Sequence, residues 1–241
     1  MLKVLITGAS SGVGLEVARR FHNENFYILL VARSADKLLA IKNELKNNIE
    51  VYPFDLMDRN SLHNFLLSLQ SDNILPDIVI HNVGGRLEAD EQPLTYEALQ
   101  QSVHLNLGIA VSINSFLLPF YVKRKKGYIL HISSDSATNG EGAPGYVASK
   151  AALNAYIKST ARFYAKDNIC INGVMPGIIE FEGSSWARKR QIAPKIYYQA
   201  LSRQPLQRFA TLQEISQFIL LLVKAQNMQT TGQIYILNGG K

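Results

Sequence analysis

The sequence has 241 residues, of which 47% are hydrophobic and 18% are charged, as in an ordinary globular protein. Because it holds no run of eighteen apolar residues, we expect no transmembrane helix and no membrane partner. The net charge of +6 is modest, and the densest basic run, residues 123–126, has no interleaved aromatic residues, which argues against a nucleic-acid partner.

The sequence contains one cysteine, Cys170, and five histidines. Because a single cysteine cannot form an internal disulfide, we expect a reducing, cytoplasmic location. The histidines show no metal-ligand spacing, so we expect no metal. For His81 and His131, near the ends of central strands, we expect hydrogen-bonded structural roles.

Short, continuous apolar runs alternate with longer amphipathic segments along the chain. Strands that are buried on both faces lack polar alternation, so these runs predict a parallel sheet covered by helices. The predicted strands are Leu2–Ile6, Tyr27–Val31, Val51–Phe54, Ile78–Ile80, Tyr128–Ile132, Ile169–Val174 and Gln233–Leu237. This alternation is typical of an α/β doubly wound parallel sheet, the Rossmann fold, and without a linker or repeat it predicts a single domain over residues 1–241.

The first glycine-rich segment, Thr7–Gly14, follows the first predicted strand and opens the first helix. Its spacing is G-x3-G-x-G, and glycine permits the tight turn and close approach that a pyrophosphate requires. The helix N-terminus adds free N–H groups for the phosphates. The same loop is compatible with an ordinary strand-to-helix turn, but its place in an alternating chain favours a dinucleotide site.

The end of the second predicted strand bears on the choice of cofactor. Arg33 lies there, where an NAD-preferring site usually has Asp or Glu, and an arginine suits the 2′-phosphate of NADP. We therefore expect NADP(H). Asp36, three residues later and expected within the helix, leaves NAD(H) open.

Tyr146 and Lys150 are four residues apart and share one face of a predicted helix. A free tyrosine, with a pKa near ~10, is a poor acid–base catalyst at neutral pH, and a nearby ammonium lowers that pKa. Such pairs are also common on exposed helices, so the pair becomes informative only together with other motifs.

Several motifs occur in one order and together closely resemble the short-chain dehydrogenase/reductase family. They are Thr7–Gly14, Asn82-Val83-Gly84, Asn106, Ile132-Ser133-Ser134, Tyr146-x-x-x-Lys150, Met175-Pro176-Gly177 and the terminal Asn238-Gly239-Gly240. The resemblance covers essentially the whole chain.

The resemblance implies a mechanism. Tyr146 would donate a proton to a substrate carbonyl as hydride arrives from the nicotinamide, and Lys150 would bind the nicotinamide ribose and lower the pKa of the tyrosine. Ser134 would bind the carbonyl oxygen, and Asn106 would hold a water behind the lysine. For Asn106 the alternative is a polar residue that kinks its helix and bonds the backbone.

The resemblance also implies a cofactor site. Asp55 would contact the adenine, Asn82 would mainly tie neighbouring strands, Gly84 would let the cofactor approach, and Ile179 would offer backbone groups to the nicotinamide amide. The full set is Gly8, Ser10, Ser11, Gly12, Val13, Gly14, Arg33, Asp55, Leu56, Asn82, Gly84, Tyr146, Lys150, Pro176, Gly177 and Ile179.

Three departures from the family pattern stand out. Ser134 lies twelve residues before Tyr146 and Ser133 thirteen, the usual separation; we favour Ser134 with a shortened loop, and Ser133 stays open. Val83 replaces the usual alanine and an extra Gly85 follows. Phe181 stands near the usual threonine after Pro-Gly, which weakens the expected contacts there.

Residues 177–205 are the least regular stretch and lie where a substrate lid is expected. Their aromatic residues suit a pocket wall, and their basic residues suit an anionic substrate, although a solvated amphipathic helix explains the same pattern. The residues concerned are Phe181, Trp186, Arg188, Lys189, Arg190, Lys195, Tyr197 and Tyr198.

The sequence therefore predicts an NADP-dependent enzyme that reduces a small carbonyl compound to an alcohol, or the reverse. The alternatives are a 3-oxoacyl-carrier-protein reductase, a sugar- or polysaccharide-pathway reductase and, in another class, a non-catalytic dinucleotide-binding regulator. The resemblance implies a homo-oligomer, dimer or tetramer, formed through long helices at about 96–123 and 146–166.

Overall fold

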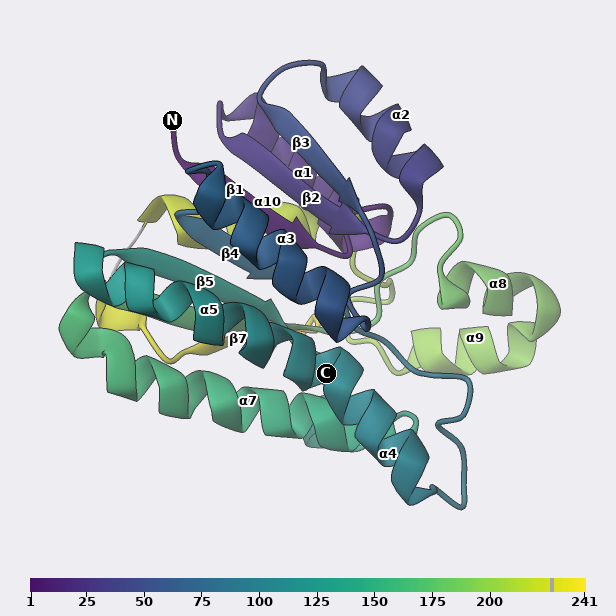
Figure 1. Ribbon diagram of the computed structural model, residues 1–241. Coiled ribbons are helices and arrows are strands. Elements are labelled where there is room, and N and C mark those ends of the chain that lie inside the picture. The colour runs from purple at the N-terminus through teal and green to yellow at the C-terminus, as the bar shows by residue number, and fades with distance from the viewer. Residues whose placement is uncertain (226–227) are drawn as a thin grey trace.

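The fold is that of a computed structural model, which describes residues 1–225 and 228–241. Seven parallel strands form one sheet in the order β3-β2-β1-β4-β5-β6-β7 (Figure 1). They are β1 (Lys3–Thr7), β2 (Tyr27–Ala32), β3 (Ile49–Pro53), β4 (Ile78–His81), β5 (Gly127–Ile132), β6 (Ile169–Pro176) and β7 (Ile234–Leu237). This confirms the predicted doubly wound sheet, and every strand end lies within two residues of its predicted position.

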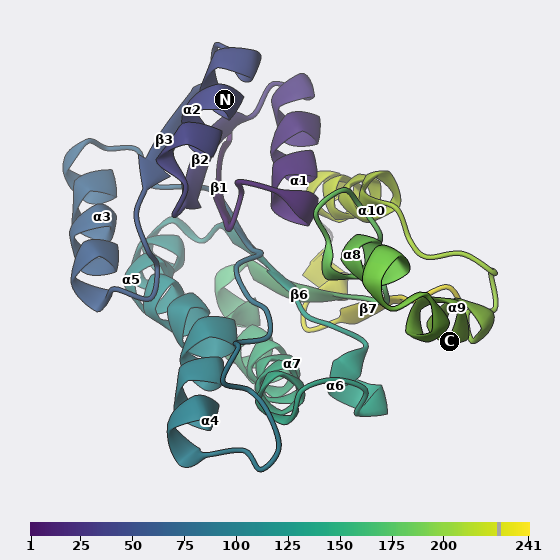
Figure 2. The same ribbon diagram turned by 90° about the vertical axis from the view of Figure 1, so that its right-hand side faces the viewer.

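Helices cover both faces of the sheet (Figures 1 and 2). On one face lie α1 (Gly12–Asn23), α2 (Ala35–Leu45) and α10 (Leu212–Ala225), and on the other lie α3 (Arg59–Ser71), α5 (Ile109–Arg124) and α7 (Pro144–Tyr164). Alternate residues of β1 serve the two cores: Val4 and Ile6 pack toward α1, and Leu5 toward α5. The central strands are buried on both faces, which is why they are mostly apolar.

The long helix predicted over residues 96–123 is interrupted in the structure. α4 (Tyr96–Val103) passes through a π-helical turn, η1 (His104–Gly108), into α5. By length and composition the combined helix Tyr96–Arg124 could span a membrane, but core helices share that composition, and α5 buries Leu117 and Tyr121 in the core. The basic run that follows Val122 ends α5, as the helix dipole favours.

The remaining elements are short or lie outside the sheet layers. α6 (Ser136–Asn139) follows β5, and 3-10 turns occur at Ala165–Asp167 and Met228–Thr230. The stretch 177–205, predicted to be irregular, contains α8 (Ser185–Ile192) and α9 (Pro194–Ser202). Figure 2 shows these two helices beyond the carboxyl ends of the strands, on the side of α1 and α10, with the C-terminal end beside α9.

Candidate active site

Tyr146 lies in the first turn of α7, and its phenol lies near the side chain of Ser134, just after β5. Burial raises the pKa of Tyr146, and the side chain of Ser134 opposes that shift. Ser133 points elsewhere: its Oγ donates to Asn154 Oδ1 at 2.7 Å. Of the two serines, the structure brings Ser134 to the tyrosine.

Lys150 lies one helical turn after Tyr146 and is 3% exposed. Its Nζ donates to the carbonyl of Ile132 at 2.7 Å and lies 5.8 Å from the centre of the Tyr146 ring. Burial lowers the pKa of Lys150 to about 8. Burial of the phenol has the largest influence on the pKa of Tyr146 and raises it, so the expected depression of that pKa by Lys150 stays a prediction.

Asn106 lies within the π-helical turn and holds the loop after β4. Its Oδ1 accepts from Gly85 N at 2.9 Å, and its Nδ2 donates to Gly85 O and Ser102 O, both at 3.0 Å. The Asn106 side chain therefore forms hydrogen bonds with the backbone at an irregularity of its helix, which agrees with the alternative that it is a polar residue bonded to the backbone. A π-helical turn often marks a functional site. A Cβ on Gly84 would lie 2.7 Å from Asn106 Oδ1 and 3.1 Å from Lys150 Nζ, so these three groups are packed together.

The glycine-rich loop has the geometry of a phosphate cradle. Gly8 and Gly12 have φ of +66° and +57°, which side chains disfavour. No side chain caps α1, whose first N–H groups stay available to an anion. Asn82 Nδ2 donates to Thr7 O at 3.1 Å and Gly8 O at 3.0 Å, and thereby ties β4 to this loop.

The segment that follows β6 lies against the glycine-rich loop. A Cβ on Gly12 would lie 2.8 Å from Phe181 Cζ, so the Phe181 ring lies directly against this glycine. Ile179 forms a parallel bridge with Ala210 that uses the carbonyl of Ile178 and the N–H of Glu180, which leaves the backbone groups of Ile179 facing the other side.

The other expected cofactor residues lie along the same edge of the sheet. Arg33 is exposed directly after β2, and Asp36 lies in the first turn of α2, as predicted. Asp55 is exposed and accepts from Met57 N at 3.0 Å, and Leu56 is buried. Ser10, Ser11, Val13 and Gly14 lie on the loop and the first turn of α1, and Pro176 and Gly177 lie at the end of β6.

The aromatic residues of 177–205 pack mainly on one another and their neighbours. Tyr197 and Trp186 both contact Phe209, with ring centres 5.2 and 5.4 Å apart, and Lys189 lies 4.2 Å from the Trp186 ring centre. Tyr198 is 57% exposed. A cavity of about 210 Å³ lies behind this region. It is lined by Ile178, Gln204, Leu206, Phe218 and Asn238, among others.

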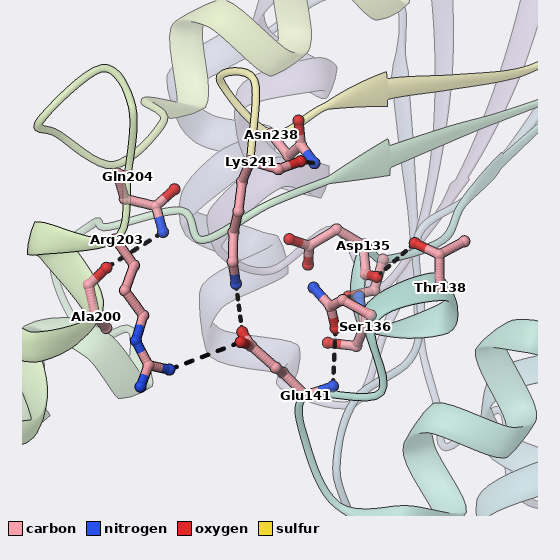
Figure 3. Close-up of polar contacts among 11 residues, drawn as sticks. Asp135, Ser136, Thr138, Glu141, Ala200, Arg203, Gln204, Asn238 and Lys241 are labelled. Atoms are coloured by element: carbon pink, nitrogen blue, oxygen red, sulfur yellow. Dashed lines mark hydrogen bonds and ion pairs between the residues drawn. The ribbon is translucent and has the colours of Figure 1, made fainter.

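A charged cluster that the sequence did not reveal lies near Asp135, the residue after Ser134 (Figure 3). Glu141, in the loop before α7, pairs with Lys241 and with Arg203 at the end of α9 (Figure 3). Asp135, next to Ser134, is 6% exposed, and its Oδ2 has no hydrogen-bond partner among the described residues. Burial raises the pKa of Asp135. These contacts join segments that are far apart in the chain, so no local sequence motif predicts them.

His81 and His131 form a buried, stacked pair, with ring centres 4.6 Å apart. His81 Nε2 bonds Asn114 Oδ1 at 2.8 Å, as a structural role requires. Both ring nitrogens of His131 lack partners within the described part of the chain, so the expected hydrogen-bonded role is wrong for that residue.

Comparison with known sequences gives one consistent result. A family model described as short chain dehydrogenase matches residues 2–191. The chain is 28% identical over 240 residues to the 3-oxoacyl-(acyl-carrier-protein) reductase FabG of Thermotoga maritima, covering 98% of this chain and 96% of that protein.

Comparison with solved structures agrees. L-sorbose reductase from Gluconobacter frateurii, complexed with NADPH and L-sorbose, matches with a TM-score of 0.88 and 28% identity over 99% of this chain and 95% of that chain. A 4-hydroxyisoleucine dehydrogenase complexed with NADH matches with a TM-score of 0.83 and 26% identity, over 99% and 97%. The similarity therefore extends over the whole fold.

Proposed function

The chain belongs to the short-chain dehydrogenase family, and from this membership we propose that it is an NADP-dependent carbonyl reductase with Tyr146 as its proton donor. Membership makes it an oxidoreductase that uses a nicotinamide dinucleotide. The observation that supports the finer proposal best is that Tyr146, with Ser134 near its phenol, has the buried Nζ of Lys150 5.8 Å from its ring centre.

The residues at the carboxyl edge of the sheet fit a dinucleotide. The positive φ angles at Gly8 and Gly12 and the uncapped start of α1 suit a pyrophosphate. The bare Cα of Gly84 leaves room in front of Lys150. When bound, the cofactor supplies the hydride. We assign the 2′-phosphate to Arg33, because it is exposed at the end of β2 and forms no ion pair among the described residues.

Three side chains would then act in the reaction, two on the substrate and one on the cofactor. Tyr146, whose pKa is raised by burial, holds a proton at neutral pH and gives it to the carbonyl oxygen. Ser134 bonds the same oxygen and stabilises the charge that develops on it. Lys150 lies behind Tyr146 and binds the ribose hydroxyls.

The cofactor is tested by titrating the protein with NADPH and NADH and following reduced-nicotinamide fluorescence. We expect Arg33→Ala to weaken the binding of NADPH by about 10- to 100-fold, because the substitution removes charge-assisted hydrogen bonds to the phosphate. The binding of NADH, which lacks that phosphate, should not change. Lys37→Ala, which removes an exposed cation from the next turn, is the control and should change neither. Tighter binding of NADH by the wild type, or no effect of Arg33→Ala, would contradict the assignment.

The reaction is tested with a panel of carbonyl compounds and Tyr146→Phe as the inactive control. The relatives name two substrate classes, a 3-oxoacyl chain on a carrier protein and the sugar L-sorbose, and both belong in the panel. Turnover that depends on Tyr146 supports the proposal. NADPH binding without any turnover would favour a non-catalytic regulator.

We also propose a homo-oligomer. Tyr96 on α4 and Phe163 on α7 are 68% and 64% exposed, which leaves apolar surface on the helices expected to meet a second copy. Light scattering tests this, and a monomeric mass would end the proposal.

A further inference from the structure

Helix α7, which carries Tyr146 and Lys150, begins without a cap of its own. Its N-cap position is Ala143, which has no side-chain acceptor, and Pro144 follows at the first helical position. The next two N–H groups, of Gly145 and Tyr146, have no partner within the helix. In a buried setting such N–H groups need an acceptor from elsewhere.

Asp90 supplies that acceptor from the loop after β4. Its Oδ1 accepts from Gly145 N and its Oδ2 accepts from Tyr146 N, both at 2.7 Å. The residue is completely buried. A Cβ at position 145 would lie 2.9 Å from Asp90 Oδ1, so the glycine there is what lets the carboxylate approach. Both carboxylate oxygens are thus used at one helix end.

The electrostatics of the contact are favourable. A helix N-terminus carries a positive partial charge, and a carboxylate that accepts two N–H bonds there is held more firmly than a neutral acceptor. Asp90 is fixed in turn, because its own carbonyl accepts from Arg86 Nε at 3.3 Å. The same loop begins at Gly84 and Gly85, which Asn106 holds beside Lys150.

We propose that Asp90 is a positioning residue for the proton-transfer step: it fixes the backbone of Tyr146, so that the phenol meets Ser134 and Lys150 in a reactive arrangement. This inference rests on the proposed function. The bond is made to the backbone N–H of the proton donor itself, so a change at Asp90 displaces the reacting group directly. Misplacement of a reacting group by about 1 Å can cost about 100-fold in rate.

The test is Asp90→Asn, which keeps the shape but turns an N–H₂ group toward a backbone N–H. We expect kcat to fall by about 10- to 100-fold while KM and the NADPH dissociation constant stay within about threefold. The control is Thr211→Ala, which removes the cap of α10, a bond from Glu214 N at 3.2 Å on the opposite face of the sheet. Both variants should melt a few degrees lower, and only Asp90→Asn should lose kcat.

Equal kcat in the two folded variants would overturn the proposal, because Asp90 would then be an ordinary helix cap. A readout that needs no variant is hydrogen exchange of the wild-type peptide that contains residues 144–150. Slow exchange at Gly145 and Tyr146 supports the contact, and exchange at the rate of unprotected loop amides would overturn it even if Asp90→Asn does not fold. Lack of any turnover by the wild type, with those two amides protected, would instead reject the proposed function.

Discussion

Two adjacent glycines offer a sharp test of how the loop after β4 shapes the site. Gly84 and Gly85 both have φ of +156°, so φ disfavours a side chain equally at the two positions. They differ in the space around them. A Cβ on Gly84 would lie 2.7 Å from Asn106 Oδ1 and 3.1 Å from Lys150 Nζ, whereas a Cβ on Gly85 would have nothing within 4 Å. Comparing Gly84→Ala with Gly85→Ala therefore isolates the clash from the backbone cost.

The neighbours of Gly84 cannot move aside easily. Asn106 is held by three hydrogen bonds, and Lys150 Nζ is bonded to Ile132 O at 2.7 Å. Overpacking of this kind costs about 1–3 kcal/mol. In a domain of this size 1 kcal/mol corresponds to about 2–4 °C in Tm, so Gly84→Ala should melt roughly 2–12 °C below Gly85→Ala.

The assay is thermal unfolding of both variants, followed by kcat and the NADPH dissociation constant at a temperature where both are folded. We expect Gly84→Ala to lose at least about tenfold in kcat, because Lys150 is pushed from its place, and Gly85→Ala to stay within a few-fold of the wild type. Equal melting temperatures and equal rates in the two variants would refute this account of the loop.

Three other expectations concern single side chains. Ser134→Ala should lower kcat by about 10²- to 10³-fold. Ser133→Ala, which loses the hydrogen bond to Asn154, should mainly lower Tm. The reverse pattern would assign the proposed role of Ser134 to Ser133. Lys150→Met should have a higher melting temperature than the wild type at pH 7. Burial lowers the pKa of Lys150 to about 8, against an ordinary 10.5, so below pH 8 the buried ammonium lowers the free energy of unfolding by about 3 kcal/mol. This destabilisation decreases as the pH rises toward 10.5. The substitution also leaves the carbonyl of Ile132 without its donor, which offsets about 1 kcal/mol of the gain in stability. A variant that melts below the wild type at pH 7 would contradict the expected stabilisation. Glu141→Gln should raise KM by at most about fivefold and leave kcat unchanged, since exposed ion pairs contribute about 0–1 kcal/mol. High salt should have the same effect on the wild type. A loss in kcat would show that Glu141 does more than form ion pairs with Lys241 and Arg203.

The sequence predicted the sheet well because its strands are buried on both faces. In β1 the side chains of Val4 and Leu5 enter opposite cores, so the consecutive residues Val4, Leu5 and Ile6 are all apolar and the run is easily recognised. Most of the proposed site residues could be placed near one another from the sequence, since they follow a strand or share a helix turn with another; their roles stay a prediction. Tyr146 and Lys150 are the clearest case, being one turn apart on α7.

The sequence did not reveal contacts between distant segments. Asn106 meets Gly85 across 21 residues, and Asp90 meets Gly145 across 55, so only the folded chain brings either pair together. For residues 177–205 an amphipathic helix was one interpretation, but the two helices and their bounds were not predicted, for a different reason. Helix α8 buries none of its residues, so it carries no apolar stripe that a periodicity argument could detect.

The burial of Tyr146 and Lys150 has a consequence for the direction of the proposed reaction. Burial disfavours the charged form of each group, so it raises the pKa of Tyr146 and lowers that of Lys150 to about 8. Around neutral pH the phenol therefore keeps its proton, as a donor to a carbonyl must, while oxidation of an alcohol needs the phenolate that burial disfavours. We accordingly expect the rate of reduction to stay nearly constant from pH 6 to pH 8 and the rate of oxidation to keep rising beyond pH 8. Oxidation that reaches its plateau below pH 7 would mean that the pKa of Tyr146 in the working complex lies far below its ordinary value, and that Lys150, not burial, controls it.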